Sequence, residues 1–218
     1  VREKILNYDV IDEALVDVHY ISFSQLDVWQ QPVSLPRVGT AQDPLLIQYT
    51  SGSTATPKGV VLNSEAIISN AHLVAQGMQV RESSVFVNWM PHYHDMGLLG
   101  NLIYPLLLGC QSVQLAPLAF VQKPLRWLKA IQNYRGSISG GPLFAYNLCW
   151  ERSPDNDLES LDLSSWQAAF CGAEPIFHRI LERFRHRFAS TGLQSDHVFG
   201  CYGLAEANLY VAGSLPNR

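Results

Sequence analysis

The chain has 218 residues and a net charge of −4, with 47% hydrophobic and 16% charged residues. The low charged fraction, against ~25% in typical soluble domains, predicts a large core with several fully buried strands. The slightly negative charge argues against nucleic acid or an anionic membrane surface as a partner, because neither would be attracted.

The cysteines and the most apolar stretch indicate the cellular compartment of the protein and whether it enters a membrane. The four cysteines are widely spaced and form no C-x-x-C pair, which favours reduced thiols in a cytoplasmic protein over disulfides or structural zinc. No signal-peptide pattern is visible in the first residues. The apolar stretch 98–108 is interrupted by Gly100, Asn101 and Pro105, so it predicts a buried helix rather than membrane insertion.

Residues 1–43 are predicted to be a partial N-terminal element and a connecting loop. Residues 11–16 fit a short helix, and residues 18–23 alternate as a strand does. Prolines and a glycine mark residues 30–43 as the loop. Residues 44–218 are predicted to form an α/β core that binds ATP and an acyl group, for the reasons that follow.

A glycine- and hydroxyl-rich segment, Tyr49–Gly59, follows the apolar run Leu45–Ile47. The order strand, loop, lysine, helix is typical of a phosphate-binding site, where backbone N–H groups, hydroxyls and a lysine converge on an anion. The segment is not a Walker A loop, because Lys58 is followed by Gly59 instead of serine or threonine. The alternative is an ordinary surface turn with a solvated lysine.

Extended and helical patterns alternate along the rest of the chain. Strands are predicted over 60–62, 85–90, 112–115, 137–141, 166–170 and 197–202, and helices over 64–78, 98–108, 124–131, 143–151 and 175–188. In the last helix, four apolar residues recur at four-residue spacing, with Pro175 near the first turn; they are Ile176, Ile180, Phe184 and Phe188. The alternation predicts an α/β fold with a largely parallel sheet flanked by helices.

The other face of this last helix is strongly basic. It carries Arg179, Arg183, Arg185, His186 and Arg187. Such a face could bind an acidic partner, but a solvated helix surface is the interpretation that the pattern favours.

Polar or glycine-containing loops follow four of the predicted strands, at 49–59, 91–97, 171–175 and 202–206. Ligands of parallel sheets bind beyond the carboxyl ends of the strands, so these loops should converge on one crevice. Tyr202 offers a flat ring on which a base could stack, and Glu206 offers a hard oxygen for Mg²⁺. The alternatives are a core aromatic at Tyr202 and a helix-start carboxylate at Glu206.

Other catalytic classes find less support. The cluster His92, His94 and Asp95 superficially resembles a metal site, but adjacent loop residues rarely direct all their ligating atoms at one ion. No Gly-x-Ser-x-Gly elbow occurs, and no residue is indicated as the nucleophile of a hydrolase.

Four motifs together resemble the AMP-forming acyl/aminoacyl adenylate superfamily, which includes acyl-CoA synthetases and luciferases. They are Tyr49–Gly59, Trp89–Leu98 (WMPHYHDMGL), Cys171–Pro175 (CGAEP) and Cys201–Ala207 (CYGLAEA). With Pro117–Phe120 and Pro124–Leu128, they are most similar to the fatty acyl-AMP ligases. The resemblance implies the central part of the large N-terminal domain of such an enzyme.

The resemblance also implies roles for individual residues. The loop around the ATP phosphates would consist of Thr50, Ser51, Gly52, Ser53, Thr54 and Lys58. Gly172, Ala173 and Glu174 would form the wall beside adenine, with Tyr202 and Gly203 on the stacking side. Glu206 and Thr54 would bind Mg²⁺, and His94 would lie near the reacting carboxylate, so that Lys58, His94 and Glu206 are the expected catalytic residues. The acyl tunnel would be near Met96, Gly140, Gly141 and Phe144.

Two positions depart from the family pattern, and two expected parts are missing. Ala55 replaces a usual glycine, and Asn208 replaces a common threonine. The catalytic lysine of the family's C-terminal domain and the ribose-binding aspartate are not in the chain. We therefore expect a central fragment of a longer protein, inactive by itself.

The implied activity uses ATP and Mg²⁺ to convert a fatty acid into acyl adenylate and pyrophosphate, for transfer to an acyl carrier protein. An acyl-CoA synthetase of the same superfamily and a non-catalytic nucleotide-binding or interaction module are the alternatives. Formation of acyl-CoA would identify the first, and nucleotide binding without pyrophosphate exchange would identify the second.

Overall fold

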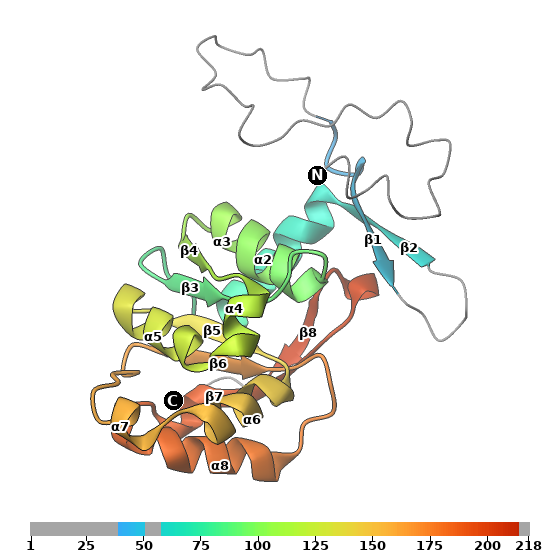
Figure 1. The fold of residues 1–218 in the computed structure, drawn as a ribbon. Helices are drawn as coiled ribbons and strands as arrows, with labels where there is room; N and C mark the ends of the chain where they lie inside the picture. Colours follow the sequence, from blue (N-terminus) through green and yellow to red (C-terminus); the bar gives the residue numbers. More distant parts are fainter. Residues whose placement is uncertain (1–38, 51–57, 214–218) are drawn as a thin grey trace, which may run out of the picture. The chain divides into compact units, whose positions relative to one another are not determined.

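The computed structural model describes residues 39–50 and 58–213, and residues from Thr40 onward belong to one compact unit. The strands form a two-stranded sheet, β1-β2, and a six-stranded sheet in the order β4-β3-β5-β6-β7-β8 (Figure 1). Their bounds are β1 Pro44–Thr50, β2 Lys58–Asn63, β3 Val85–Asn88, β4 Gln111–Gln114, β5 Ile138–Gly141, β6 Ala168–Cys171, β7 Val198–Gly203 and β8 Tyr210–Gly213.

The larger sheet is parallel except at one edge. Strands β4, β3, β5, β6 and β7 pair in parallel, whereas β8 pairs antiparallel with β7. Every residue of β5 and β6 is buried, as is typical of parallel strands covered by helices on both faces. The predicted α/β fold with a largely parallel sheet is confirmed.

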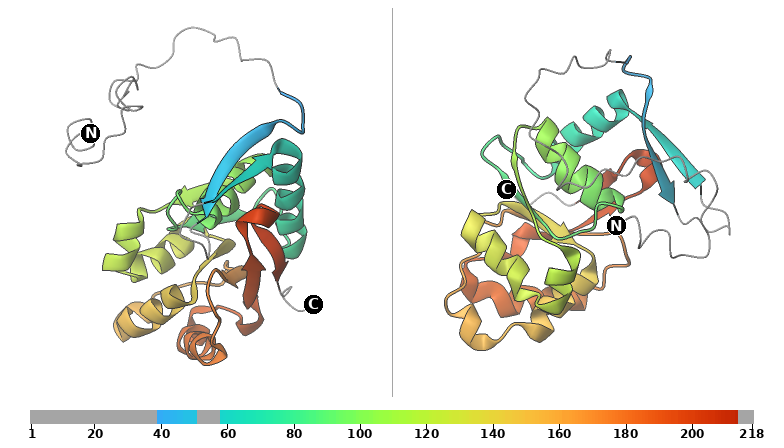
Figure 2. Two further views of the ribbon diagram at one scale, coloured as in Figure 1. Left: turned by 90° about the vertical axis from the view of Figure 1, so that its right-hand side faces the viewer. Right: turned by 45° about the horizontal axis from the view of Figure 1, so that its top comes forward.

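Helices cover both faces of this sheet (Figure 2). Helix α2 and the segment η3–α3 lie against one face, and α5, α6 and α8 lie against the other (Figures 1 and 2). The helices are α2 Ser64–Gly77, the π-helix η3 Met96–Ile103, α3 Tyr104–Leu107, α4 Pro117–Gln122, α5 Leu125–Tyr134, α6 Leu143–Arg152, α7 Asp155–Leu158 and α8 His178–Phe188. Short 3-10 turns occupy Ala189–Thr191, Ser195–His197 and Ala205–Ala207. No helix of the described part of the chain is both long and apolar enough to cross a bilayer.

Aromatic side chains fill the space between the sheet and helices α5, α6 and α8. Trp127 and Trp166 lie 5.2 Å apart, and Tyr146 and Phe184 lie 4.9 Å apart, both in edge-to-face geometry. The Trp127 indole N–H donates to Ser139 Oγ at 2.8 Å, so its polar group is satisfied in the interior. This packing anchors the strands from one side.

Helix α2 follows the sequence pattern closely. Asn63 caps it by accepting a hydrogen bond from the Ala66 N–H at 2.8 Å. Ile67, Ala71 and Val74 are buried on one face, as predicted. The cap and the apolar stripe together fix where the helix begins and which face it buries.

Two predicted elements need correction. Helix α8 begins at His178, so Pro175 and Ile176 precede it, and the side chains that it buries are Leu181, Phe184 and Phe188. The predicted helix 98–108 is a π-helix over Met96–Ile103 followed by one α-helical turn. The predicted strand 60–62 is confirmed as part of β2, which pairs antiparallel with β1.

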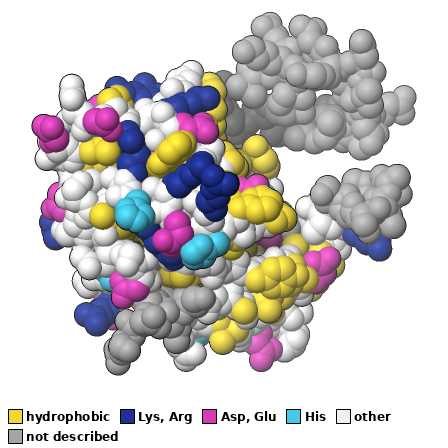
Figure 3. All heavy atoms as spheres, turned by 90° about the horizontal axis from the view of Figure 1, so that it is seen from below, with side chains coloured by type: hydrophobic (Ala, Val, Ile, Leu, Met, Phe, Trp, Pro, Cys, Tyr) yellow, Lys and Arg dark blue, Asp and Glu magenta, His cyan; other side chains and the backbone are white. Residues whose placement is uncertain are grey.

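Two basic side chains of α8 pair with acidic residues. Arg185 pairs with Glu182, and Arg187 lies 2.7 Å from Asp155. Figure 3, seen from the side on which α8 lies in Figure 1, shows basic, acidic and histidine side chains interspersed. This arrangement agrees with the interpretation of α8 as a solvated surface.

Candidate functional site

Three of the four motif-bearing loops follow neighbouring strands of the large sheet. Residues 91–97 come shortly after β3, residues 171–175 include the end of β6, and residues 202–206 include the end of β7. Because β3, β5, β6 and β7 are parallel, these loops emerge at the same edge. The fourth loop is part of the separate β1–β2 hairpin.

The hairpin holds both ends of the hydroxyl-rich loop together. Thr50 and Lys58 are directly paired residues of β1 and β2, and Thr50 Oγ1 donates to the Lys58 carbonyl at 3.5 Å. Lys58 is exposed, so its ammonium group is accessible to an anion. Ser51, Gly52, Ser53 and Thr54 lie outside the described residues.

His94 is oriented by its neighbour Asp95. Their Nδ1 and Oδ1 atoms are 2.9 Å apart, and the same carboxylate oxygen accepts the Met96 N–H at 2.6 Å. The hydrogen bond to Asp95 raises the pKa of His94 above its ordinary 6.5, partial burial opposes this shift, and the Asp95 charge adds to it. The Met96 N–H also lies 3.2 Å from Nδ1, but it is closer to Asp95 Oδ1. The 2.9 Å distance between Nδ1 and the same carboxylate oxygen therefore favours a proton on Nδ1. The Nε2 atom is therefore the one left to face a substrate.

The segment after β6 combines close packing with an unusual backbone. A Cβ atom at Gly172 would lie 2.8 Å from Cys201 Sγ and 2.9 Å from the Cys201 carbonyl oxygen, so only glycine fits there. Ala173 has a φ of 67°, a left-handed conformation that is costly for a residue with a side chain. Glu174 accepts a hydrogen bond from the Phe144 N–H at 2.8 Å, so part of its carboxylate binds the start of α6.

The segment after β7 presents an aromatic ring and a carboxylate. Tyr202 is 62% exposed, which rules out the alternative of a core aromatic. A Cβ at Gly203 would lie 2.0 Å from the Leu209 carbonyl oxygen, so this glycine allows the chain to turn back into β8. Glu206 is exposed in the turn Ala205–Ala207 and forms no salt bridge with the other described residues.

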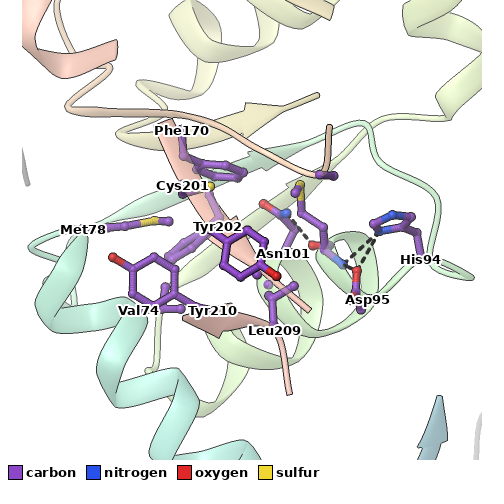
Figure 4. Close-up of a pocket in the computed structure, with 15 residues that line it drawn as sticks. Val74, Met78, His94, Asp95, Asn101, Phe170, Cys201, Tyr202, Leu209 and Tyr210 are labelled. Carbon is purple, nitrogen blue, oxygen red and sulfur yellow. Dashed lines mark hydrogen bonds and ion pairs between the residues drawn. The ribbon is translucent and has the colours of Figure 1, made fainter. Parts of the chain in front are cut away.

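An apolar cavity of about 190 Å³ adjoins these residues (Figure 4). His94, Asp95, Ala173, Tyr202 and Gly203 line it together with side chains from α2, β3, η3, β6 and the β7–β8 segment. The apolar part of its lining consists mainly of Val74, Met78, Phe86, Met96, Phe170 and Leu209. His94, Asp95 and Tyr202 thus lie beside a cavity whose mainly apolar lining suits an apolar chain.

Of the residues expected beside an acyl tunnel, the structure brings only Met96 to this cavity. Gly140 and Gly141 instead allow close packing, since Cβ atoms there would lie 2.1 Å from the Phe170 carbonyl oxygen and 2.7 Å from the Trp89 ring. Phe144 packs edge-to-face on Trp89 at 5.8 Å. These three residues do not line the cavity of the described chain.

The cysteines of this region are not nucleophiles. Cys171 is buried and Cys201 lines the cavity. Burial raises the pKa of each thiol to about 12, so both remain protonated at neutral pH.

Sequence reasoning missed two buried asparagines, Asn70 and Asn101. Asn70 joins α2 to the segment 207–210, and Asn101 lines the cavity from η3. The available signal was an amide side chain within an otherwise apolar helical pattern, because a buried polar group needs partners.

Comparison with known proteins identifies the family. The model of the AMP-binding enzyme family matches residues 5–218. The chain belongs to the AMP-binding enzymes. This confirms the resemblance that the four motifs indicate.

Relatives within the AMP-binding enzymes include ligases of fatty acids. The chain is 47% identical over 167 residues to the medium-chain-fatty-acid–[acyl-carrier-protein] ligase TtuA of Teredinibacter turnerae, covering 77% of the chain and 26% of TtuA. It is 38% identical over 192 residues to the long-chain-fatty-acid–AMP ligase FadD26 of Mycobacterium marinum, covering 86% of the chain and 32% of FadD26. The chain thus spans about a quarter to a third of the length of these relatives.

A solved structure shares the fold. The fatty acyl-adenylate ligase of L. pneumophila, in complex with acyl adenylate and pyrophosphate, matches 85% of this AMP-binding chain and 32% of its own with a TM-score of 0.78 and 40% identity. The architecture described above is therefore that of part of an adenylate-forming enzyme.

Proposed function

We propose that the intact gene product activates a fatty acid with ATP to form acyl adenylate and pyrophosphate, and then delivers the acyl group to an acyl carrier protein. The observation that carries this proposal is the apolar cavity that opens beside His94, Ala173 and Tyr202. Family membership and the names of the relatives support the same reaction, and TtuA supports the carrier protein as acceptor.

The fatty acid would lie with its chain in the cavity and its carboxylate near His94. The cavity is lined mostly by apolar side chains, which favour an alkyl chain over a charged ligand. His94, with a raised pKa and with Nδ1 held by Asp95, would present Nε2 to the carboxylate or to a phosphoryl oxygen. The imidazole then supplies a directed hydrogen bond at the boundary between the polar and apolar parts of the site.

ATP would bind across the loops. The largely exposed Tyr202 ring provides a face for stacking adenine, while the backbone of Gly172–Glu174 provides the opposite wall. The hydroxyl-rich loop from Thr50 to Lys58 would surround the β- and γ-phosphates, with Lys58 as its cation.

Glu206 suits Mg²⁺ because it is an exposed carboxylate with no salt bridge to a described residue. Magnesium in nucleotide sites is usually held by one or two carboxylates together with substrate phosphates. When bound, it withdraws charge from phosphoryl oxygens. Thr54 is the second ligand that we propose.

The protein contributes position and charge to the reaction. A carboxylate oxygen forms a bond to the α-phosphorus as the bond to pyrophosphate breaks on the opposite side, so the residues must hold both reactants in line. Lys58 would stabilise the charge on the departing pyrophosphate, and His94 would fix the acid. No covalent enzyme intermediate is required.

Replacing Lys58 tests this assignment. In the intact gene product, Lys58→Ala should lower fatty-acid-dependent ATP–pyrophosphate exchange roughly 100- to 1000-fold, because losing one preorganised charge contact costs about 3–4 kcal/mol. Lys123→Ala is the matched control, since Lys123 is an exposed lysine that follows α4 and should leave exchange unchanged.

Three results would contradict parts of the proposal. Exchange that is unaffected by Lys58→Ala would remove Lys58 from the site. If the intact product formed acyl-CoA as readily as acyl carrier protein thioester, an acyl-CoA synthetase would replace the carrier-protein ligase. Binding of ATP without any exchange would indicate a non-catalytic nucleotide-binding module.

A further inference from the structure

Side chains of helix α2 form the end of the apolar cavity that lies opposite His94. In Figure 4, His94 and Asp95 lie on one side of the cavity. The other side is formed by Val74, Met78 and Tyr210. Under the proposed function the carboxylate of the acid lies near His94, so the methyl end of its chain points toward α2. The residues at this end therefore decide how long a chain the cavity holds.

This end of the cavity is braced by contacts between α2 and β8. Tyr210 packs so closely on α2 that a Cβ atom at Gly77 would lie 2.6 Å from the tyrosine hydroxyl oxygen. Asn70, also on α2, donates to the Tyr210 carbonyl at 2.8 Å and accepts the Tyr210 N–H at 3.0 Å. Separating the strand from the helix to lengthen the cavity would break both hydrogen bonds, which is costly for buried groups.

The apolar side chains of this wall that come from α2 are Val74 and Met78. They lie four residues apart and thus on one face of the helix, and they are 3% and 6% exposed. The Met78 N–H donates to the Val74 carbonyl at 2.9 Å at the end of the helix, so the backbone at Met78 is held in place. Its unbranched side chain is of the kind that fills irregular space in a core. The volume at this end of the cavity therefore depends on these two side chains.

We propose that Met78 and Val74 limit the length of the acyl chain, so that the enzyme activates medium-chain acids in preference to long-chain acids. This inference rests on the proposed function, because it treats the cavity as the acyl site. A cavity of about 190 Å³ is small beside the ~300–1,000 Å³ of sites for drug-sized ligands. A chain that is too long meets the two side chains and must displace them, which is costly in a closely packed interior.

The test compares saturated straight-chain acids of increasing length on the intact gene product. The kcat/KM for ATP–pyrophosphate exchange is measured for each acid, and the optimum of the unaltered enzyme should fall among medium-chain acids. Met78→Ala removes most of a side chain that lines the end of the cavity. It should raise the kcat/KM of an acid about two carbons longer at least about tenfold relative to that of the original optimum, because one methylene in an apolar pocket changes kcat/KM by about 10- to 200-fold.

Two substitutions at Val74 test the wall in both directions. Val74→Ala enlarges the cavity and should shift the optimum to longer acids. Val74→Ile adds a methylene group and should shift the optimum to shorter acids. These variants also decide the question if Met78→Ala folds poorly. Each ratio of kcat/KM values is taken on one preparation, so a smaller folded fraction cancels.

Ile67→Ala is the matched control for these substitutions. Ile67 is 1% exposed and lies in the same helix, but it is not among the residues that line the cavity. Its replacement should lower stability as other core truncations do. It should leave the chain-length optimum where it is.

The outcomes separate the inference from the proposed function. Exchange with an optimum among long-chain acids, or an optimum that moves in neither Met78→Ala nor the Val74 variants, overturns the length limit and leaves the proposed function standing. An equal shift in Ile67→Ala also overturns it, since the effect would then come from loosening α2 as a whole. The absence of exchange with any fatty acid overturns the proposed function and this inference together.

Discussion

Asn70 shows how one buried amide can organise the residues around it. From α2, its Nδ2 donates to the carbonyls of Ala207 and Tyr210, and its Oδ1 accepts the Tyr210 N–H and the Tyr104 hydroxyl. It is 4% exposed, so water does not replace these bonds easily. The turn that carries Glu206 is thereby tied to α2.

Removing this amide should destabilise the protein. Asn70→Ala leaves the four groups bonded to Asn70 without this partner and should lower the free energy of unfolding by about 3 kcal/mol, since each unpaired buried group is costly. Urea denaturation followed by tryptophan fluorescence measures the change.

Asn147→Ala is the matched control for this substitution. Asn147 also lies in a helix, and its side chain bonds only Glu151 among the residues that the structure describes. Its replacement should therefore change stability by less than about 0.5 kcal/mol. Equal losses in the two variants would show that Asn70 has no special structural role.

The His94–Asp95 pair predicts a pH dependence. Since the folded-state pKa of His94 is raised above 6.5, the pair stabilises the protein fully below that value and loses this contribution as pH rises through the folded-state pKa. Asp95→Asn should therefore lower the His94 pKa in an NMR titration. It should also cost more stability at about pH 5.5 than at about pH 8.5.

Asp157→Asn serves as the control for charge removal. Asp157 pairs with Lys129 at 2.7 Å, and this pair contains no histidine. Its replacement should thus cost the same at both pH values. A His94 pKa that does not move in Asp95→Asn would contradict the orientation of the imidazole described above.

At the scale of elements, the sequence did not determine the course of a turn or the type of a helix, because these depend on contacts between residues that are distant in the sequence. The segment 202–213 turns back as an antiparallel hairpin because Gly203 admits the Leu209 carbonyl oxygen. Periodicity predicted the helix after Gly97 but not its π-helical part, because apolar spacing over a few residues does not separate the helix types. The start of α8 was misplaced because Ile176 continues the apolar spacing although it lies before the helix.

The β7–β8 turn gives a prediction at this scale. Gly203→Ala places a Cβ 2.0 Å from the Leu209 carbonyl oxygen, so it should destabilise the protein by about 1–3 kcal/mol, as overpacking does. It should also weaken ATP binding, measured by calorimetry on the intact gene product, because Tyr202 and Glu206 flank the turn.

Gly200→Ala on the same strand is the control. A Cβ there would meet the end of the Ile176 side chain at 3.0 Å, and that flexible group can move. Its effect on ATP affinity should be small. Loss of affinity in both variants alike would indicate that any change in β7 disturbs the site, and that the turn at Gly203 is not the cause.

At the scale of the whole molecule, the site depends on strand order. Residues 94, 173 and 202 are far apart in the chain, yet all line one cavity. They come together because β3, β6 and β7 are parallel members of the same sheet. The sequence predicted that these loops converge, because the loops at the carboxyl ends of parallel strands lie at one edge of the sheet.

The sequence by itself determined the α/β class, the motif-bearing segments and the family, because these depend on local periodicity and on short runs of residues such as Tyr49–Gly59 and Cys201–Ala207. Only the tertiary structure decided that the hydroxyl-rich loop joins two antiparallel strands, that Glu174 binds the start of α6, and that Asn70 and Asn101 are buried. Each of these depends on which distant backbone groups meet a side chain. Hydrogen-bond partners up to 140 residues apart leave no periodic signal in the sequence.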